Sequence, residues 1–118
     1  MNLTSDHEIK IILDSTHDGM IAVNTAGVVT LFNHAAERIT GLKASSVIGK
    51  PAVDTIPNTR LHIVLREGKE ELNQEQRIGD AVIVTNRVPV RDERGSLIGA
   101  VAVFRDITEI RSLSDAVA

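Results

Sequence analysis

The chain contains no cysteine, tryptophan or tyrosine, and it has only two phenylalanines, Phe32 and Phe104. Without cysteine there are no disulfides, no thiolate metal ligands and no thiol nucleophiles. With so few rings, nucleic-acid recognition by base stacking and a large planar cofactor held between aromatic side chains are both disfavoured. The sequence therefore directs attention to aliphatic packing and to polar side chains.

Strong charge imbalance and long hydrophobic runs are also missing. The net charge is −3, which argues against a basic surface for nucleic acid. No apolar run approaches the roughly 20 residues of a membrane span, and the first residues lack the basic region of a signal peptide. We therefore expect no direct contact with nucleic acid or membrane, and a cytoplasmic location.

The length of 118 residues, with 42% hydrophobic and 25% charged residues, fits one globular domain. Ser5 and Glu8 have the spacing of a capping box, and apolar residues follow at helical spacing, which predicts an amphipathic helix within residues 1–17. Two apolar segments joined by a short turn come next, and they predict an antiparallel hairpin with strands at 20–23 and 28–32.

The rest of the chain reads as short helices followed by strands. Helices are expected at 33–41, 43–48 and 57–68, strands at 71–78, 81–90 and 97–104. Five antiparallel strands with the helices gathered into one insertion predict an α+β fold. We expect an N-terminal helix over 1–17 that dimerises or caps the domain, a core over 18–106 and the start of an exit helix over 107–118.

Three motifs carry a resemblance to a known family. Asp18-Gly19-Met20 enters the first strand, Asn33-His34-Ala35-Ala36-Glu37 follows the second, and the last strand ends in Asp106-Ile107-Thr108. This order of motifs resembles the PAS domain over essentially the whole chain. The resemblance implies the PAS fold, a five-stranded antiparallel sheet with short helices on one face and flanking terminal helices.

A narrower resemblance involves Ile56–Leu61, Gly68-Lys69 and Val84–Val90. These segments look like the PAS domain that precedes the ATPase in bacterial sigma-54-dependent transcriptional activators. The residues used by flavin-binding relatives, a cysteine or a tryptophan and tyrosine, are absent. His62 lies on the helix that supplies the haem ligand in some relatives, but no haem motif surrounds it, so neither flavin nor haem is expected.

Asn86 is the first candidate ligand contact. Strand alternation places its amide on one face with Val84 and Val88, and a buried amide without hydrogen bonds costs about 1–3 kcal/mol. One interpretation is a ligand anchor in a pocket between sheet and helices. The other is a hydrogen bond to the backbone of a neighbouring loop, and both stay open.

Arg60 lies in the first turn of a predicted helix, where a guanidinium can hold a carboxylate or phosphate. The alternative is that Arg60 is an ordinary surface residue, although a positive charge is unfavourable at the N-terminal end of a helix dipole. Asn33, Asn58 and Gln76 are further candidate ligand contacts. The alternative for the two asparagines is helix capping, and the alternative for Gln76 is a solvated position on the sheet. His34 and Glu37 are one helical turn apart but suggest no third ligand, so no metal site is expected.

Asp106 and Thr108 stand where the last strand meets the exit helix. Their oxygens can accept backbone amides of the first helical turn and so fix the angle of the helix. The resemblance implies that this junction carries the signal to the next domain. An ordinary helix cap is the compatible alternative.

These observations predict a sensory domain that binds a small cytoplasmic metabolite, an amino acid or carboxylate. We expect it to form a homodimer and to relay the signal to a downstream output domain, a sigma-54-interacting ATPase. The alternative is a ligand-free dimerisation module of a sensor histidine kinase or another signalling protein. No nucleophile is paired with a base, so no catalysis by the domain itself is expected.

Overall fold

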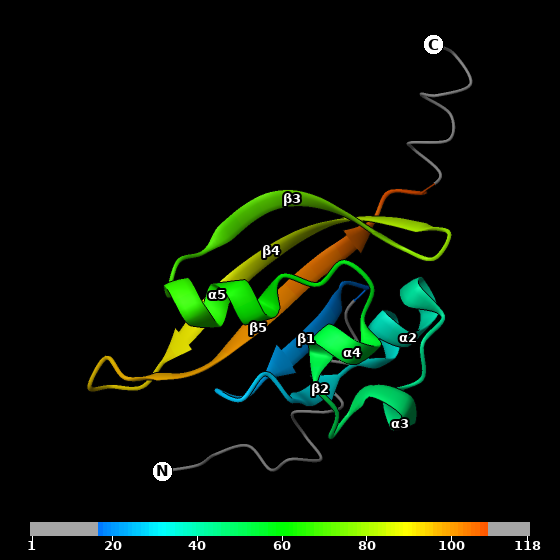
Figure 1. Ribbon diagram of the computed structural model, residues 1–118. Helices are drawn as coiled ribbons and strands as arrows, with labels where there is room; N and C mark the ends of the chain where they lie inside the picture. The colour runs from blue at the N-terminus through cyan, green and yellow to red at the C-terminus, as the bar shows by residue number, and fades with distance from the viewer. Residues whose placement is uncertain (1–16, 109–118) are drawn as a thin grey trace.

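The computed structural model describes residues 17–108, which form one antiparallel sheet and four short helices (Figure 1). The strands are β1 (Gly19–Val23), β2 (Val29–Phe32), β3 (Glu71–Ile78), β4 (Ala81–Arg91) and β5 (Leu97–Asp106). The helices are α2 (His34–Thr40), α3 (Ala44–Val47), α4 (Ala52–Thr55) and α5 (Leu61–Glu67). The predicted α+β fold with a five-stranded antiparallel sheet is confirmed. The expected terminal helices lie outside the described residues, apart from residues 17, 107 and 108.

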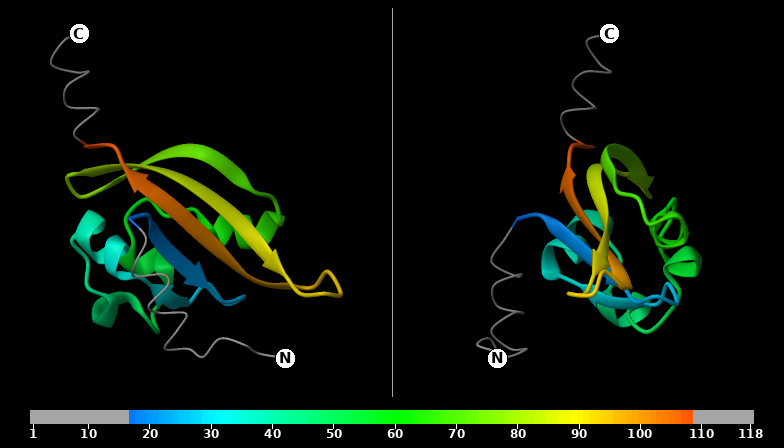
Figure 2. Two further views of the ribbon diagram at one scale, coloured as in Figure 1. Left: turned by 180° about the vertical axis from the view of Figure 1, so that it is seen from behind. Right: turned by 90° about the vertical axis from the view of Figure 1, so that its left-hand side faces the viewer.

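The strand order β2-β1-β5-β4-β3 explains why the helices cover the sheet. Strands β2 and β3 are consecutive in the chain but form opposite edges of the sheet. The 33–70 segment that connects them must therefore cross one face, and it carries all four helices (Figure 2). Helix α5 packs against β4 and β5, and α2 packs against β1.

Local signals explain where the helices begin and end. The Asn33 side chain accepts the backbone N–H of Ala36, and Gly41 ends α2 with a left-handed φ of 77°, as expected for a helix cap and terminator.

The sequence did not predict α4, because four residues leave no periodicity to detect. This helix is fixed instead by tertiary contact, since the N–H of Ala52 donates to the carbonyl of Gly27 across 2.9 Å.

Helix α5 begins later than the sequence predicted. Asn58 has a φ of 60°, which is left-handed, so the chain is not yet helical there. The helix starts at Leu61 and ends at Gly68, whose φ is 65°. Thr59 accepts the N–H of Leu61 at 3.3 Å, and Arg60 occupies the N-cap position without a side-chain cap.

The hydrophobic core lies between the sheet and the helical segment. From the 33–70 segment, Ile56, Leu61 and Val64 are each at most 3% exposed, and they belong to the same cluster as the strand residues Ile21, Ile83 and Phe104. We call the face that carries these strand residues the inner face. At Gly19 a side chain would meet the Phe104 ring at 2.3 Å, so β1 and β5 approach as closely as they do only because residue 19 has none.

Candidate functional site

Buried polar side chains gather on the inner face of β4. Ile83, Thr85 and Arg87 alternate along this strand and point to the same side. Their directly paired residues on β5 include the core residues Ala102 and Phe104, which confirms that they face the helices. Thr85 is 1% exposed and Arg87 is 2% exposed. A guanidinium is rarely buried this completely unless its charge is matched.

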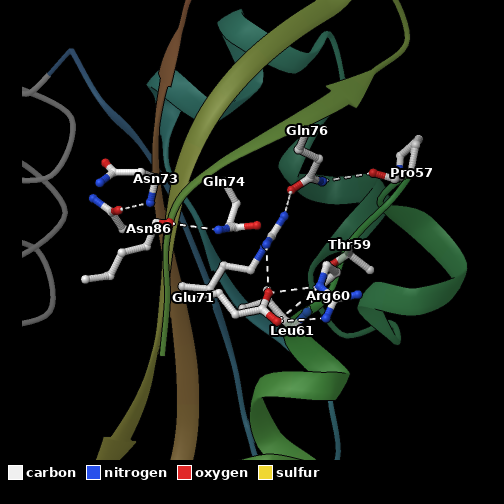
Figure 3. A network of polar contacts seen from close by, with 11 residues as sticks. Pro57, Thr59, Arg60, Leu61, Glu71, Asn73, Gln74, Gln76 and Asn86 are labelled. Carbon is white, nitrogen blue, oxygen red and sulfur yellow. Dashed lines mark hydrogen bonds and ion pairs between the residues drawn. The ribbon is translucent and has the colours of Figure 1, made fainter. Parts of the chain in front are cut away.

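The charge of Arg87 is matched by Glu71, the first residue of β3. Nη1 of Arg87 donates to Oε1 of Glu71 at 2.8 Å. Arg60 reaches the same carboxylate from the start of α5, with its Nε 2.9 Å from Oε1 and its Nη2 2.8 Å from Oε2. Figure 3 shows Arg60 and Glu71 pointing toward each other. One carboxylate is therefore held by two guanidinium groups, one buried and one half-exposed.

Gln76 extends this cluster toward the helical segment. Its Oε1 accepts Nη2 of Arg87 at 2.8 Å, and its Nε2 donates to the carbonyl of Pro57 at 2.9 Å. Gln76 is 8% exposed, so its amide is buried, and the alternative interpretation that it is solvated is wrong. Gln74, by contrast, is exposed and donates to the carbonyl of Leu72. We refer to Arg60, Glu71, Gln76 and Arg87 as the arginine cluster.

Thr85 is the one buried side chain of the described residues whose polar atom has no hydrogen-bond partner. Its hydroxyl sits two residues from Arg87 on the same face, about 7 Å along the strand. An unpartnered buried hydroxyl costs about 1–3 kcal/mol in proteins. A site that keeps this cost next to a buried cation is a candidate for polar ligand binding.

The electrostatics of the arginine cluster favour an anion. The hydrogen bond from Arg60 is the main cause that lowers the pKa of Glu71 below its usual range, and Arg87 adds to it. Burial lowers the pKa of Arg87, against the opposing effect of Glu71. Two guanidinium charges share one carboxylate, so one positive charge is in excess, with Glu67 as a more distant acidic neighbour of Arg60.

Asn86 lies on the other side of the sheet from the arginine cluster, which corrects the prediction that it faces the helices. It is exposed, and its Oδ1 accepts the backbone N–H of Asn73 at 2.8 Å. Figure 3 shows Asn73 and Asn86 on one side of the strands and Gln76 and Arg60 on the other. The residue thus makes the backbone bond that was the alternative interpretation. Asn73, with a φ of 55°, lies at a β-bulge between Glu71 and Gln74.

The other two asparagines make backbone hydrogen bonds. Asn33 caps α2 and also accepts the N–H of Met20 at 2.9 Å, which ties the helix to β1. Asn58 does not cap α5 as expected, because its left-handed backbone turns it toward β3, where its Nδ2 donates to the carbonyl of Arg77 at 2.8 Å. Neither belongs to the arginine cluster.

The junction after β5 is anchored to the start of β4. Asp106 accepts the N–H of Thr108 at 2.9 Å, as an N-cap would. The hydroxyl of Thr108 in turn accepts the N–H of Val82 at 2.9 Å, and the N–H of Ile107 donates to the carbonyl of Val82 at 2.8 Å. Movement of β4 would therefore change the hydrogen bonds of Ile107 and Thr108, where the chain leaves the sheet.

Sequence reasoning missed Thr85, Arg87 and Glu71. The alternation of β4 was recognised, but the run of valines made the Asn86 face look like the core face. The signal that was available is Ile83 with Thr85 on the alternate face, because two β-branched residues on that face are equally compatible with burial.

Two further properties concern the described residues as a whole. Within 17–108, no helix is long and apolar enough to cross a membrane. Over the same range, no group of three or more histidine or acidic side chains is placed to hold a metal ion. His62 is exposed on α5.

Comparison with known proteins places this geometry in context. Residues 8–107 match the family described as the PAS fold. The chain is 47% identical over 108 residues to the sensor protein CitS of Halalkalibacterium halodurans, covering 90% of this chain and 20% of that protein. It is 31% identical to a probable C4-dicarboxylate sensor kinase of the same organism, covering 86% of this chain and 19% of the relative. It is also 36% identical to the sensor histidine kinase DcuS of Escherichia coli K12, covering 88% and 20%.

A solved PAS domain from Colwellia psychrerythraea superposes with a TM-score of 0.68 at 18% identity, covering 87% of this chain and 97% of that one. This likeness supports the fold. The chain spans about a fifth of the length of the curated relatives named above.

The relatives correct two expectations from the sequence. They are sensors and sensor kinases, so the narrower resemblance to sigma-54-dependent activators is not supported, and the alternative of a sensor histidine kinase is favoured. The same relationship contradicts the expected cytoplasmic location. That expectation rested on the lack of a signal peptide and of an apolar run in a chain that covers only a fifth of such sensors.

Proposed function

Because the chain belongs to the PAS family, we propose that it is the sensory domain of a sensor histidine kinase and that it binds a small carboxylate. The observation that carries the ligand class is the buried guanidinium of Arg87 on the inner face, beside the unpartnered hydroxyl of Thr85. A buried guanidinium and a buried hydroxyl on the same face of β4, two residues apart, can each bind one end of a small dicarboxylate or hydroxycarboxylate. The names of the relatives, a C4-dicarboxylate sensor among them, support the same class.

The route of the signal follows from the position of β4. This strand carries Thr85 and Arg87 on its inner face, and near its start the backbone N–H of Val82 donates to the hydroxyl of Thr108. A ligand that shifts β4 would change the hydrogen bonds that set the direction of the chain after Asp106. The domain then acts through binding alone, without catalysis of its own, and the histidine kinase is the output. The homodimer stays a prediction, since both expected terminal helices lie outside the described residues.

A calorimetric titration of the chain with succinate and citrate tests the proposal, with putrescine as a cationic control of similar length. Binding of at least one carboxylate and none of the diamine is expected. Arg87→Met should weaken that binding by tenfold or more, since a charge-assisted hydrogen bond is worth about 1.5–3 kcal/mol. The matched control is Arg105→Met on the neighbouring strand, because Arg105 is 78% exposed and lies outside the arginine cluster.

A second function, a ligand-free interaction module, is favoured by one observation. Thr85 and Arg87 are closed off from solvent by the side chains of the domain itself. If no carboxylate binds at millimolar concentration, and Arg87→Met alters only stability, the carboxylate proposal fails and the interaction module is the better account.

A further inference from the structure

The Glu71 carboxylate occupies the position that a ligand carboxylate needs. Arg60 holds it through Nε and Nη2 and Arg87 holds it through Nη1, all between 2.8 and 3.1 Å. This is the planar, fork-shaped recognition by which guanidinium groups bind free carboxylates. The chain therefore supplies its own anion to the site that the proposed function assigns to a ligand.

The geometry points to Glu71 as an internal competitor that is displaced when a carboxylate ligand binds to Arg60 and Arg87. The inference rests on the proposed function and adds a regulation to that site. Arg87 is closed to solvent, whereas the side chain of Glu71 is 19% exposed and that of Arg60 is 48% exposed. An incoming carboxylate therefore meets the Arg60 and Glu71 end of the cluster first, and the departure of Glu71 uncovers Arg87.

The start of β3 is built to move in this way. Glu71 is the first residue of the strand, and regular pairing with β4 resumes only at Gln74 after a bulge. The bulge leaves Leu72 and Asn73 without a ladder partner, so Glu71, which pairs with Arg87, is separated from the rest of the ladder and depends more on its side-chain contacts. The bulge itself is held by Asn86 from the opposite side of the sheet, through the N–H of Asn73.

Displacement of Glu71 therefore has a readout on the other face. When the carboxylate leaves, the ion pairs that anchor the start of β3 two residues before Asn73 are lost, so we expect the hydrogen bond from the N–H of Asn73 to Asn86 to open more often and this N–H to exchange more readily with solvent. The excess positive charge of the arginine cluster favours replacement of Glu71 by the ligand, because a dicarboxylate brings two negative charges where Glu71 supplies one.

Two variants and one exchange measurement test the inference. Glu71→Gln removes the competing charge and should bind succinate or citrate about tenfold more tightly than the wild type, since the competent state is then populated without displacement. The matched control is Glu70→Gln, which removes the same charge one residue away from an exposed position outside the cluster. This control should leave the affinity within twofold of the wild type.

Hydrogen exchange of the wild-type chain with the same carboxylate supplies an independent arm, which stands even if Glu71→Gln does not fold. Ligand should increase exchange at the amide of Asn73 and leave that of Ala36, at the α2 cap, unchanged. If the wild type binds a carboxylate while Glu71→Gln binds it no better and Asn73 keeps its protection, the displacement is wrong and the proposed function stands. If no carboxylate binds to the wild type or to Glu71→Gln, both are wrong.

Discussion

Replacing Thr85 by valine should stabilise the domain, although Thr85 is among its most buried residues. The hydroxyl is 1% exposed and has no hydrogen-bond partner among the described residues. Valine has nearly the same shape and removes only the polar atom, so the substitution abolishes a desolvation cost of about 1–3 kcal/mol without opening a cavity. For a domain of this size, 1 kcal/mol raises Tm by about 4–8 °C.

The control is the same substitution at Thr40. There the hydroxyl donates to the carbonyl of Ala36 at 2.7 Å and accepts the N–H of Leu42 at 3.1 Å. Thr40→Val loses both bonds and should destabilise the domain by about 1 kcal/mol. The two variants thus make the same chemical change, and they are expected to shift Tm in opposite directions. Differential scanning calorimetry without ligand measures both shifts.

A titration with carboxylate completes the experiment. If the hydroxyl of Thr85 contacts the ligand, Thr85→Val gains stability and loses affinity, by about threefold to tenfold for one hydrogen bond. An unchanged or lowered Tm for Thr85→Val would refute the reasoning, because the hydroxyl would then have a partner in solution and no cost to recover.

Three further results are expected. Arg87→Met should lower the free energy of unfolding by about 2 kcal/mol, because Glu71 then loses its buried cationic partner. A double-mutant cycle with Glu71→Gln that shows no coupling energy would contradict the contact between the two side chains. Arg60 and Arg87 hold the pKa of Glu71 below 4.5, so the contribution of the ionised Glu71 to stability is fully present above pH 4.5 and is lost as pH falls through the folded-state pKa. The Tm difference between wild type and Glu71→Gln should therefore shrink as pH falls through that window. A Tm difference that does not depend on pH would contradict this role of Glu71. Gly19→Ala should cost about 1–3 kcal/mol in chemical denaturation, because its new methyl group meets the buried Phe104 ring, and a neutral result would show that the ring can move.

Elements with a local signal were predictable. The asparagine cap and glycine terminator of α2 are recognised by spacing alone, and the two segments joined by the turn at 92–96 are rich enough in β-branched and other apolar residues to be recognised as strands. Helix α4 and the late start of α5 were not predictable. Their bounds depend on contacts with Gly27 and on the left-handed Asn58, neither of which leaves a pattern in the neighbouring residues.

The candidate site shows the same division. Arg60 was recognised as a side chain able to hold a carboxylate, and the structure supplies that carboxylate from Glu71, 11 residues further along the chain. Gln76 was included as a candidate and is buried at the cluster. Arg87 was passed over because it stands next to Asn86, and only one of two neighbouring strand residues can face the core.

The sequence alone determined that residues 82, 84, 86 and 88 share one face of β4 and that residues 83, 85 and 87 share the other, because strand side chains repeat with period two. It did not determine which face is covered, since both carry β-branched residues. The tertiary structure decided this, because the 33–70 segment must pass from one edge of the sheet to the other and can cover only the face it crosses. That crossing buries Thr85 and Arg87 and leaves Asn86 exposed.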